Sequence, residues 1–212
     1  MPLKAAIVPV TPFQQNCTLL WDEESKAGAV VDPGGDLERI EEAIAKTGLR
    51  PEKILLTHGH VDHAAGADEL KERLGGVPIE GPHIADKFLL EGLAAQAAAF
   101  GHFSARNVTP DRWLKEGDSV NAAGTTFSVL HCPGHSPGSV VMVDRGQRFA
   151  LVGDVLFRGS IGRTDFPYGD HAALIDAIKT KLLPLGDAIV FVCGHGPMSS
   201  FGDERKSNPF LR

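Results

Sequence analysis

The sequence contains few cysteines, and no two of them lie close together. Cys17, Cys132 and Cys193 are odd in number and widely separated, so they indicate neither a disulfide framework nor a C-x-x-C metal or redox pair. A reducing compartment suits such a chain, and we expect a cytoplasmic protein.

Long apolar runs and clusters of positive charge are also missing. No stretch approaches the ~18 apolar residues of a transmembrane helix. Pro9 and Pro12 interrupt the apolar N-terminal segment, which therefore does not resemble a signal peptide. The 21 Lys and Arg residues are outnumbered by 27 Asp and Glu residues, and they form no basic patch. We therefore expect neither nucleic acid nor membrane as a partner.

No linker or low-complexity tract divides the 212 residues. A chain of this length buries roughly 70% of its surface around one core, and we expect a single domain over residues 1–212. Short apolar runs between turn residues predict strands, and apolar positions at helical spacing predict helices. The expected strands cover 3–10, 17–21, 27–31, 53–57, 118–120, 125–131, 140–143, 149–152 and 188–192. The expected helices start at 37, where Asp36 could act as the cap, and cover 64–74, 86–100 and 172–183. Such an order predicts an α/β sandwich with outer helices.

Histidines gather in three short loops, each of which follows a predicted strand. They are accompanied by two aspartates, and the set is His58, His60, Asp62 and His63 in H-G-H-V-D-H, then His135, Asp154 and His195. Imidazole and carboxylate are ligands for Zn, Fe and Mn. Three imidazoles within six residues would repel one another if protonated, whereas a bound metal requires them to be neutral. The sequence therefore predicts a metal site.

The order of these motifs resembles the metallo-β-lactamase superfamily. THGHVDH is followed by PGHSPGS, a GD pair and GHGP. Within the superfamily the chain is most similar to the short glyoxalase II-like (hydroxyacylglutathione hydrolase-like) bacterial hydrolases, through VVDPGGD, LHCPGHSPGS, GRTDFPYGD, KLLPLGD and NPFLR. The resemblance covers nearly the whole chain. It implies the metallo-β-lactamase αββα sandwich, in which two mixed sheets pack together and the metals lie at one edge.

The resemblance also implies a ligand set for two divalent metals, zinc first and iron or manganese as alternatives. The first metal would be held by His58, His60 and His135, the second by Asp62, His63 and His195, and Asp154 would bridge them. Asp32 would support the metal loop through hydrogen bonds, although an ordinary turn residue is an equal interpretation.

Such a site implies a thioester hydrolase of the glyoxalase II type. A hydroxide shared by the metals, together with Asp62 and Asp154, would attack a small acyl-glutathione such as S-lactoylglutathione. No thiol nucleophile is required, so we interpret Cys132 and Cys193 as buried structural residues. Arg158 and Arg163 could bind a substrate carboxylate, and an ion pair with Asp165 is the competing interpretation.

Other functions share these motifs. In glyoxalase II a helical C-terminal domain supplies much of the glutathione site, and only 17 residues follow His195, so we expect that domain to be absent. A persulfide dioxygenase would use one Fe(II) on His58, His135 and Asp154, and it shares the seven ligand positions and a GRTDF-like loop. A lactone or ester hydrolase, including a β-lactamase, is a further alternative. A non-enzymatic metal-stabilised module is disfavoured by the intact ligand set.

Overall fold

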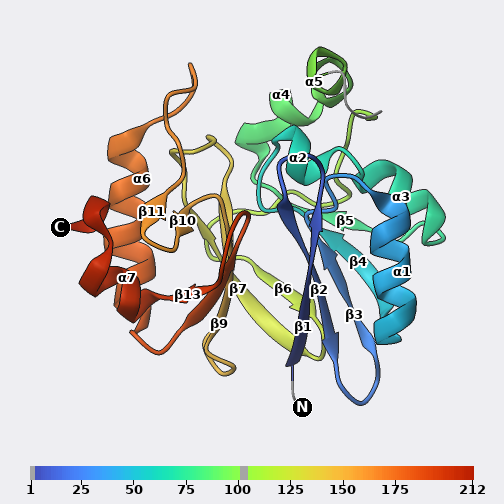
Figure 1. Cartoon of the computed structure of the whole chain (residues 1–212), viewed down its shortest axis with the longest axis horizontal. Coiled ribbons are helices and arrows are strands. Elements are labelled where there is room, and N and C mark those ends of the chain that lie inside the picture. The colour runs from blue at the N-terminus through green and yellow to red at the C-terminus, as the bar shows by residue number, and fades with distance from the viewer. Residues whose placement is uncertain (1–2, 101–104) are drawn as a thin grey trace.

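Two β-sheets face each other, and helices cover both outer sides (Figure 1). The structure is a computed structural model that describes residues 3–100 and 105–212. The first sheet has the order β1-β2-β3-β4-β5, in which β1 to β3 are antiparallel and β4 and β5 run parallel to β3. Its strands are β1 (Leu3–Val10), β2 (Gln15–Asp22), β3 (Ala27–Val31), β4 (Arg50–Leu55) and β5 (Ile79–Glu80).

The second sheet has the order β13-β12-β9-β8-β7-β6, with one parallel pair between β12 and β9. Its strands are β6 (Ser119–Ala122), β7 (Thr125–His131), β8 (Val140–Asp144), β9 (Phe149–Gly153), β12 (Val190–Cys193) and β13 (Ser199–Ser200). A separate small hairpin joins β10 (Leu156–Phe157) to β11 (Ser160–Ile161).

Helices α1 and α3 cover the first sheet, and α6 and α7 cover the second (Figure 1). The first half contains α1 (Leu37–Thr47), α2 (Val61–Ala64), α3 (Ala67–Arg73), the 3₁₀ turn η1 (Ile84–Asp86), α4 (Lys87–Leu90) and α5 (Leu93–Phe100). The second half contains α6 (His171–Ala177), the π-helical turn η2 (Ile178–Leu182), the 3₁₀ turns η3 (Leu183–Leu185) and η4 (Pro209–Leu211), and α7 (Phe201–Ser207).

The structure has three apolar cores: one lies between the two sheets, and one lies under the helices on each outer side. Successive side chains of the central strands alternate between the inner core and an outer core. In β2, Leu19 packs beneath the helices of the first half and Leu20 packs between the sheets. In β8, Met142 lies between the sheets and Val143 faces the helices of the second half. Because successive strand residues point to opposite faces, apolar residues at every position bury both faces of each sheet. The expected αββα fold is confirmed.

Three local expectations are wrong. The helix expected over 64–74 is divided, because Ala64 ends α2 and the backbone N–H of Gly66, before α3, donates to the carbonyl of Pro33 at 3.0 Å. The helix expected over 86–100 is divided between α4 and α5. Asp36 precedes α1, but its carboxylate accepts from the N–H of Thr11 at 2.8 Å and makes no capping bond to the helix. Every helix within residues 3–100 and 105–212 is too short or too polar to span a membrane.

Candidate metal centre

The seven candidate ligands follow the carboxyl ends of four strands. His58 comes three residues after β4, His135 lies in the loop between β7 and β8, Asp154 directly follows β9, and His195 is two residues beyond β12. Asp62 and His63 lie on α2, which starts where the loop after β4 ends. The paired sheets thereby bring residues from both halves of the chain to one edge.

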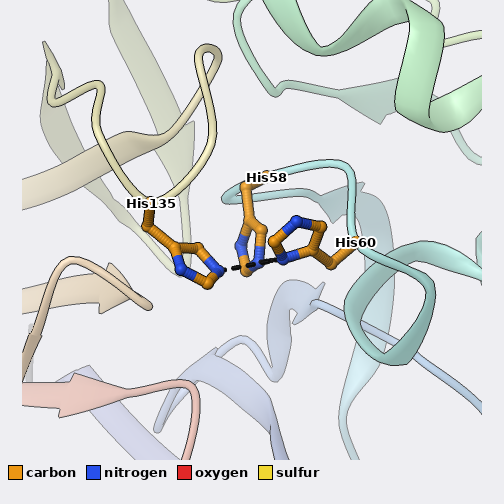
Figure 2. A group of neighbouring side chains, drawn as sticks. All are labelled: His58, His60 and His135. Carbon is orange, nitrogen blue, oxygen red and sulfur yellow. Dashed lines mark hydrogen bonds between the residues drawn. The ribbon is translucent and has the colours of Figure 1, made fainter. Parts of the chain in front are cut away.

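Three imidazoles meet at the centre of this edge. Nδ1 of His60 lies 3.1 Å from Nε2 of His58 and 2.9 Å from Nε2 of His135, and all three side chains are buried (Figure 2). Burial, followed by the charge of His135, lowers the pKa of His60 to about 3, and burial also holds the pKa of His58 well below 6.5. The rings of His58 and His60 are therefore neutral, and the nitrogens of all three rings converge as the ligand atoms of a cation site would.

A second group lies beside the first. Nε2 of His195 is 3.2 Å from Oδ2 of Asp62 and 3.4 Å from Nε2 of His63. The ligand atoms of these three residues all fall within 4.8 Å of one another. This group also has the composition and the spacing of a metal-binding site.

Asp154 lies between the two groups. Its Oδ1 is 3.3 Å from Nε2 of His63, and its Oδ2 is 3.5 Å from Nε2 of both His135 and His195. Burial raises the pKa of Asp154, but these imidazoles outweigh it, and the carboxylate stays ionised. Its Oδ1 is buried and accepts no hydrogen bond from the described part of the chain. A buried anionic oxygen without a donor needs a cation, so the residues present fit two divalent metals.

The outward-facing nitrogen of each histidine has a hydrogen-bonding partner. The pairs are His58 Nδ1 with Thr57 Oγ1 at 3.1 Å, His60 Nε2 with Tyr168 Oη at 2.9 Å, His63 Nδ1 with Asp32 Oδ2 at 3.0 Å, His135 Nδ1 with the Arg163 carbonyl at 2.9 Å and His195 Nδ1 with the Phe13 carbonyl at 3.2 Å. Such partners fix the orientation and tautomer of metal-binding histidines. Five of five rings thus have the arrangement that metal ligation requires.

Asp32 connects two of these ligands from beneath. Its carboxylate accepts from the N–H of Thr57 at 2.7 Å, from the Thr57 hydroxyl at 2.6 Å, and from Nδ1 of His63. Thr57 in turn contacts His58. The same carboxylate therefore orients one ring of each group.

Asp86 is a candidate positioning residue that the sequence does not indicate. It is fully buried, and its carboxylate accepts from the N–H of Gly59 at 2.8 Å, the hydroxyl of Ser136 at 2.7 Å and the N–H of Gly138 at 2.5 Å. These donors belong to the loops that carry His60 and His135. Asp86 thus joins two ligand loops that are more than 70 residues apart in sequence, and no local pattern could reveal it.

Glycine is required beside the ligands at position 194. A Cβ there would lie 2.0 Å from Oδ1 of Asp154 and 2.5 Å from Cε1 of His63. Any side chain would displace both ligands.

A cavity of about 530 Å³ opens onto both groups, and the two candidate arginines differ in their relation to it. Arg163 lines the cavity, lies 4.4 Å over the ring of Phe166, and makes two 2.7 Å bonds to Asp165. The ion pair with Asp165 is therefore present. Arg158 is not among the described residues that line this cavity; it lines a separate hollow with Met198 and Asp203.

Cys132, which directly follows β7, and Cys193, the last residue of β12, are buried thiols. Burial raises the pKa of Cys193 to about 11 and that of Cys132 to about 12, so both stay protonated near neutral pH. Cys193 donates through Sγ to the carbonyl of His195 at 3.0 Å. Neither has the environment of an activated nucleophile.

Comparison with known proteins defines the family. Residues 10–195 match the model of the metallo-beta-lactamase superfamily, and the chain belongs to this superfamily of metallo-hydrolases. It is 48% identical over 206 residues to a protein named hydroxyacylglutathione hydrolase GloC from Haemophilus influenzae, covering 97% of this chain and 96% of that protein.

Two solved structures are also similar. A di-iron-bound form of TTHA1623 superposes with a TM-score of 0.86 at 38% identity and covers 97% of this chain and 100% of its own. The B3 metallo-beta-lactamase BLEG-1 superposes with a TM-score of 0.89 at 35% identity and covers 98% and 99%.

Proposed function

We propose that the protein is a binuclear hydrolase of thioesters whose substrate is a small acyl-glutathione such as S-lactoylglutathione. The observation that carries the proposal is the position of Asp154 between two complete ligand groups. The similarity to GloC over almost the full length supports the choice of substrate. Zinc is our first choice of metal, and the di-iron form of TTHA1623 makes iron the next, with manganese third.

We assign the first metal to His58, His60 and His135, the second to Asp62, His63 and His195, and the bridge to Asp154. Two divalent cations held there would lower the pKa of water to near neutrality and polarise a thioester carbonyl. Asp62 and Asp154 are both ionised despite burial, since facing imidazoles lower their pKa. They can therefore orient the groups that react at this edge, and the cavity lets an acyl thioester reach them.

A persulfide dioxygenase would need His58, His135 and Asp154 alone, and it would leave His60, His63 and His195 without a role. In this structure those three rings are oriented by outer partners as fully as the others are. Because the dioxygenase shares all seven ligand positions, this arrangement fits either function, and the number of bound metals together with the reaction separates them.

The test combines metal counting with two assays. Protein purified without oxygen should bind close to two metals per chain, release thiol from S-lactoylglutathione, and consume no oxygen with glutathione persulfide. Asp154→Ala should lower occupancy of both sites, whereas His195→Ala should empty one. One iron per chain with persulfide-dependent oxygen uptake would contradict the proposal, and so would an Asp154→Ala variant that loses a single metal.

A further inference from the structure

Aromatic side chains surround the cavity over the metal-binding groups. Four of the 11 phenylalanines and the single tyrosine of the chain line it: Phe13, Phe100, Phe157, Phe166 and Tyr168. They come from the turn between β1 and β2, the end of α5, the hairpin β10–β11 and the loop before α6. Four separate segments thus contribute rings to one cavity.

The rings reach the candidate ligands directly. The centroid of Phe166 lies 4.9 Å from that of His60 and 5.9 Å from that of His135, and Phe157 lies 6.2 Å from His195. A group attached next to a carbonyl at the metal centre would therefore contact aromatic faces immediately.

At the outer rim, Phe13 and Phe100 pack edge to face with centroids 5.5 Å apart. They remain 42% and 48% exposed. Large rings that are exposed next to a functional site are typical of surfaces that a ligand covers.

Outside the metal-binding groups, the cavity walls carry few charges that could pair with the charges of glutathione. Among the described lining residues Arg163 is then the one remaining cation, and Asp165 already holds it through two hydrogen bonds. Glutathione carries two carboxylates and an ammonium group, and outside the metal-binding groups the described lining residues offer its carboxylates no cation free of an ion pair. Its charged ends fit the solvent side of the cavity, whereas the acyl group fits the rings.

We infer that this cavity selects thioesters whose acyl group carries an aromatic or large branched apolar side chain over lactoyl thioesters. The inference rests on the proposed thioester hydrolysis, and it replaces the small acyl group with a larger apolar one as the preferred substrate class. Moving such a side chain from water onto the rings adds binding that a methyl group cannot provide. The transition state retains this contact, so kcat/KM should rise.

The experiment uses three glutathione thioesters that share the thiol and the α-hydroxyl group: lactoyl, 2-hydroxy-4-methylpentanoyl and 3-phenyllactoyl. Each kcat/KM of the metal-loaded protein is divided by the rate of alkaline hydrolysis of the same thioester. We expect the 3-phenyllactoyl ester to exceed the lactoyl ester by roughly 10- to 100-fold, with the branched ester between them.

Phe13→Ala and Phe100→Ala should each reduce the ratio of phenyllactoyl to lactoyl kcat/KM by at least about threefold. Phe210→Ala is the matched control, because Phe210 is 47% exposed and is not among the residues that line this cavity. Its ratio should equal that of the parent protein.

The outcomes separate the two proposals. Lactoyl hydrolysis with a ratio at or below one would overturn the acyl preference and leave the thioester hydrolase standing. A ratio that Phe210→Ala lowers as much as Phe100→Ala would also overturn the preference. If metal-loaded protein hydrolyses none of the three esters, the proposed function and this inference both fail.

Discussion

The hydroxyl oxygen of Tyr168 lies 2.9 Å from Nε2 of His60, the nitrogen on the side of that ring away from His58 and His135. If Nδ1 of His60 binds metal, its ring proton is on Nε2 and donates to Tyr168. Burial raises the pKa of Tyr168 to about 12, so the phenol remains a neutral partner. The only tyrosine of the chain thus supplies the acceptor that this tautomer of a candidate ligand requires.

Tyr168→Phe should weaken the first metal site roughly tenfold, because the ring is kept and the hydrogen bond to His60 is lost. Competition with a chelator measures the affinity. Phe88→Ala is the control, since Phe88 contacts the ring of Tyr168 at a centroid distance of 5.3 Å. It should leave metal affinity unchanged. A Tyr168→Phe variant that binds both metals like the parent would contradict this role.

Asp86→Asn tests the connection between the two ligand loops. The amide has the size of the carboxylate, but its NH₂ group faces one of the three donors from Gly59, Ser136 and Gly138. We expect a loss of about 1–3 kcal/mol in the free energy of unfolding of the metal-free protein, together with weaker binding at the first site. Chemical denaturation and metal titration provide the two values.

The control for Asp86→Asn is Asp187→Asn. Asp187 forms an exposed ion pair with Arg205, and such pairs contribute little to stability. If both variants unfold at the same denaturant concentration, Asp86 does not have the positioning role.

The sequence reveals the strands and the candidate ligands for different physical reasons. β1, β3 and β7 match their predicted bounds, because apolar runs bordered by turn residues are local signals. The candidate ligands form a motif, because His and Asp are concentrated in short loops that follow strands. Asp86 and Tyr168 act through contacts across 50 and 108 residues, so no local pattern contains their roles.

Arg158 shows the limit of sequence proximity. It lies four residues after Asp154, yet the hairpin β10–β11 directs the chain so that Arg158 lines a different hollow. Arg163, nine residues after Asp154, returns to the cavity, and its carbonyl holds His135. The hairpin β10–β11 places Arg158 in its turn, away from the site, and returns the chain so that Arg163 reaches the cavity. Its two strands are too short to give a sequence pattern that predicts this.

Cys193→Ser and Cys132→Ser should each retain activity within about threefold, whereas His58→Ala and His135→Ala should abolish it. Both thiols are protonated near neutral pH, and metal-activated water needs no thiol nucleophile. Thiol release from S-lactoylglutathione is the measurement, with metal content determined on the same samples. Loss of turnover in Cys193→Ser, with two metals bound and the fold intact, would assign the attack to the cysteine.

The metal-free protein should lose stability as the pH falls from 6.5 to 5. In the folded state the pKa of His60 is about 3, and that of His58 is also well below 6.5. The unfolded chain therefore takes up protons at these residues in this interval while the folded protein does not. Each histidine then costs up to about 1.4 kcal/mol per pH unit.

Titration of His63, Asp62 and Asp154 changes the stability of the metal-free protein mainly outside this pH interval. The carboxylates Asp62 and Asp154 raise the pKa of His63 despite its burial, so the stability that His63 adds is complete below 6.5 and is lost at higher pH. The lowered pKa of Asp62 and Asp154 makes their contribution fall mainly below pH 5, as the unfolded carboxylates take up protons near 3.8. Denaturant midpoints of chelator-treated protein at pH 6.5, 5.75 and 5 therefore report mainly on His58 and His60, together with His83, whose pKa is also lowered by burial and by His131. His60→Gln should reduce the slope, whereas His171→Gln, at an exposed position, should retain it. Equal stability at pH 6.5 and 5 would show that the buried histidines are not held neutral by the fold.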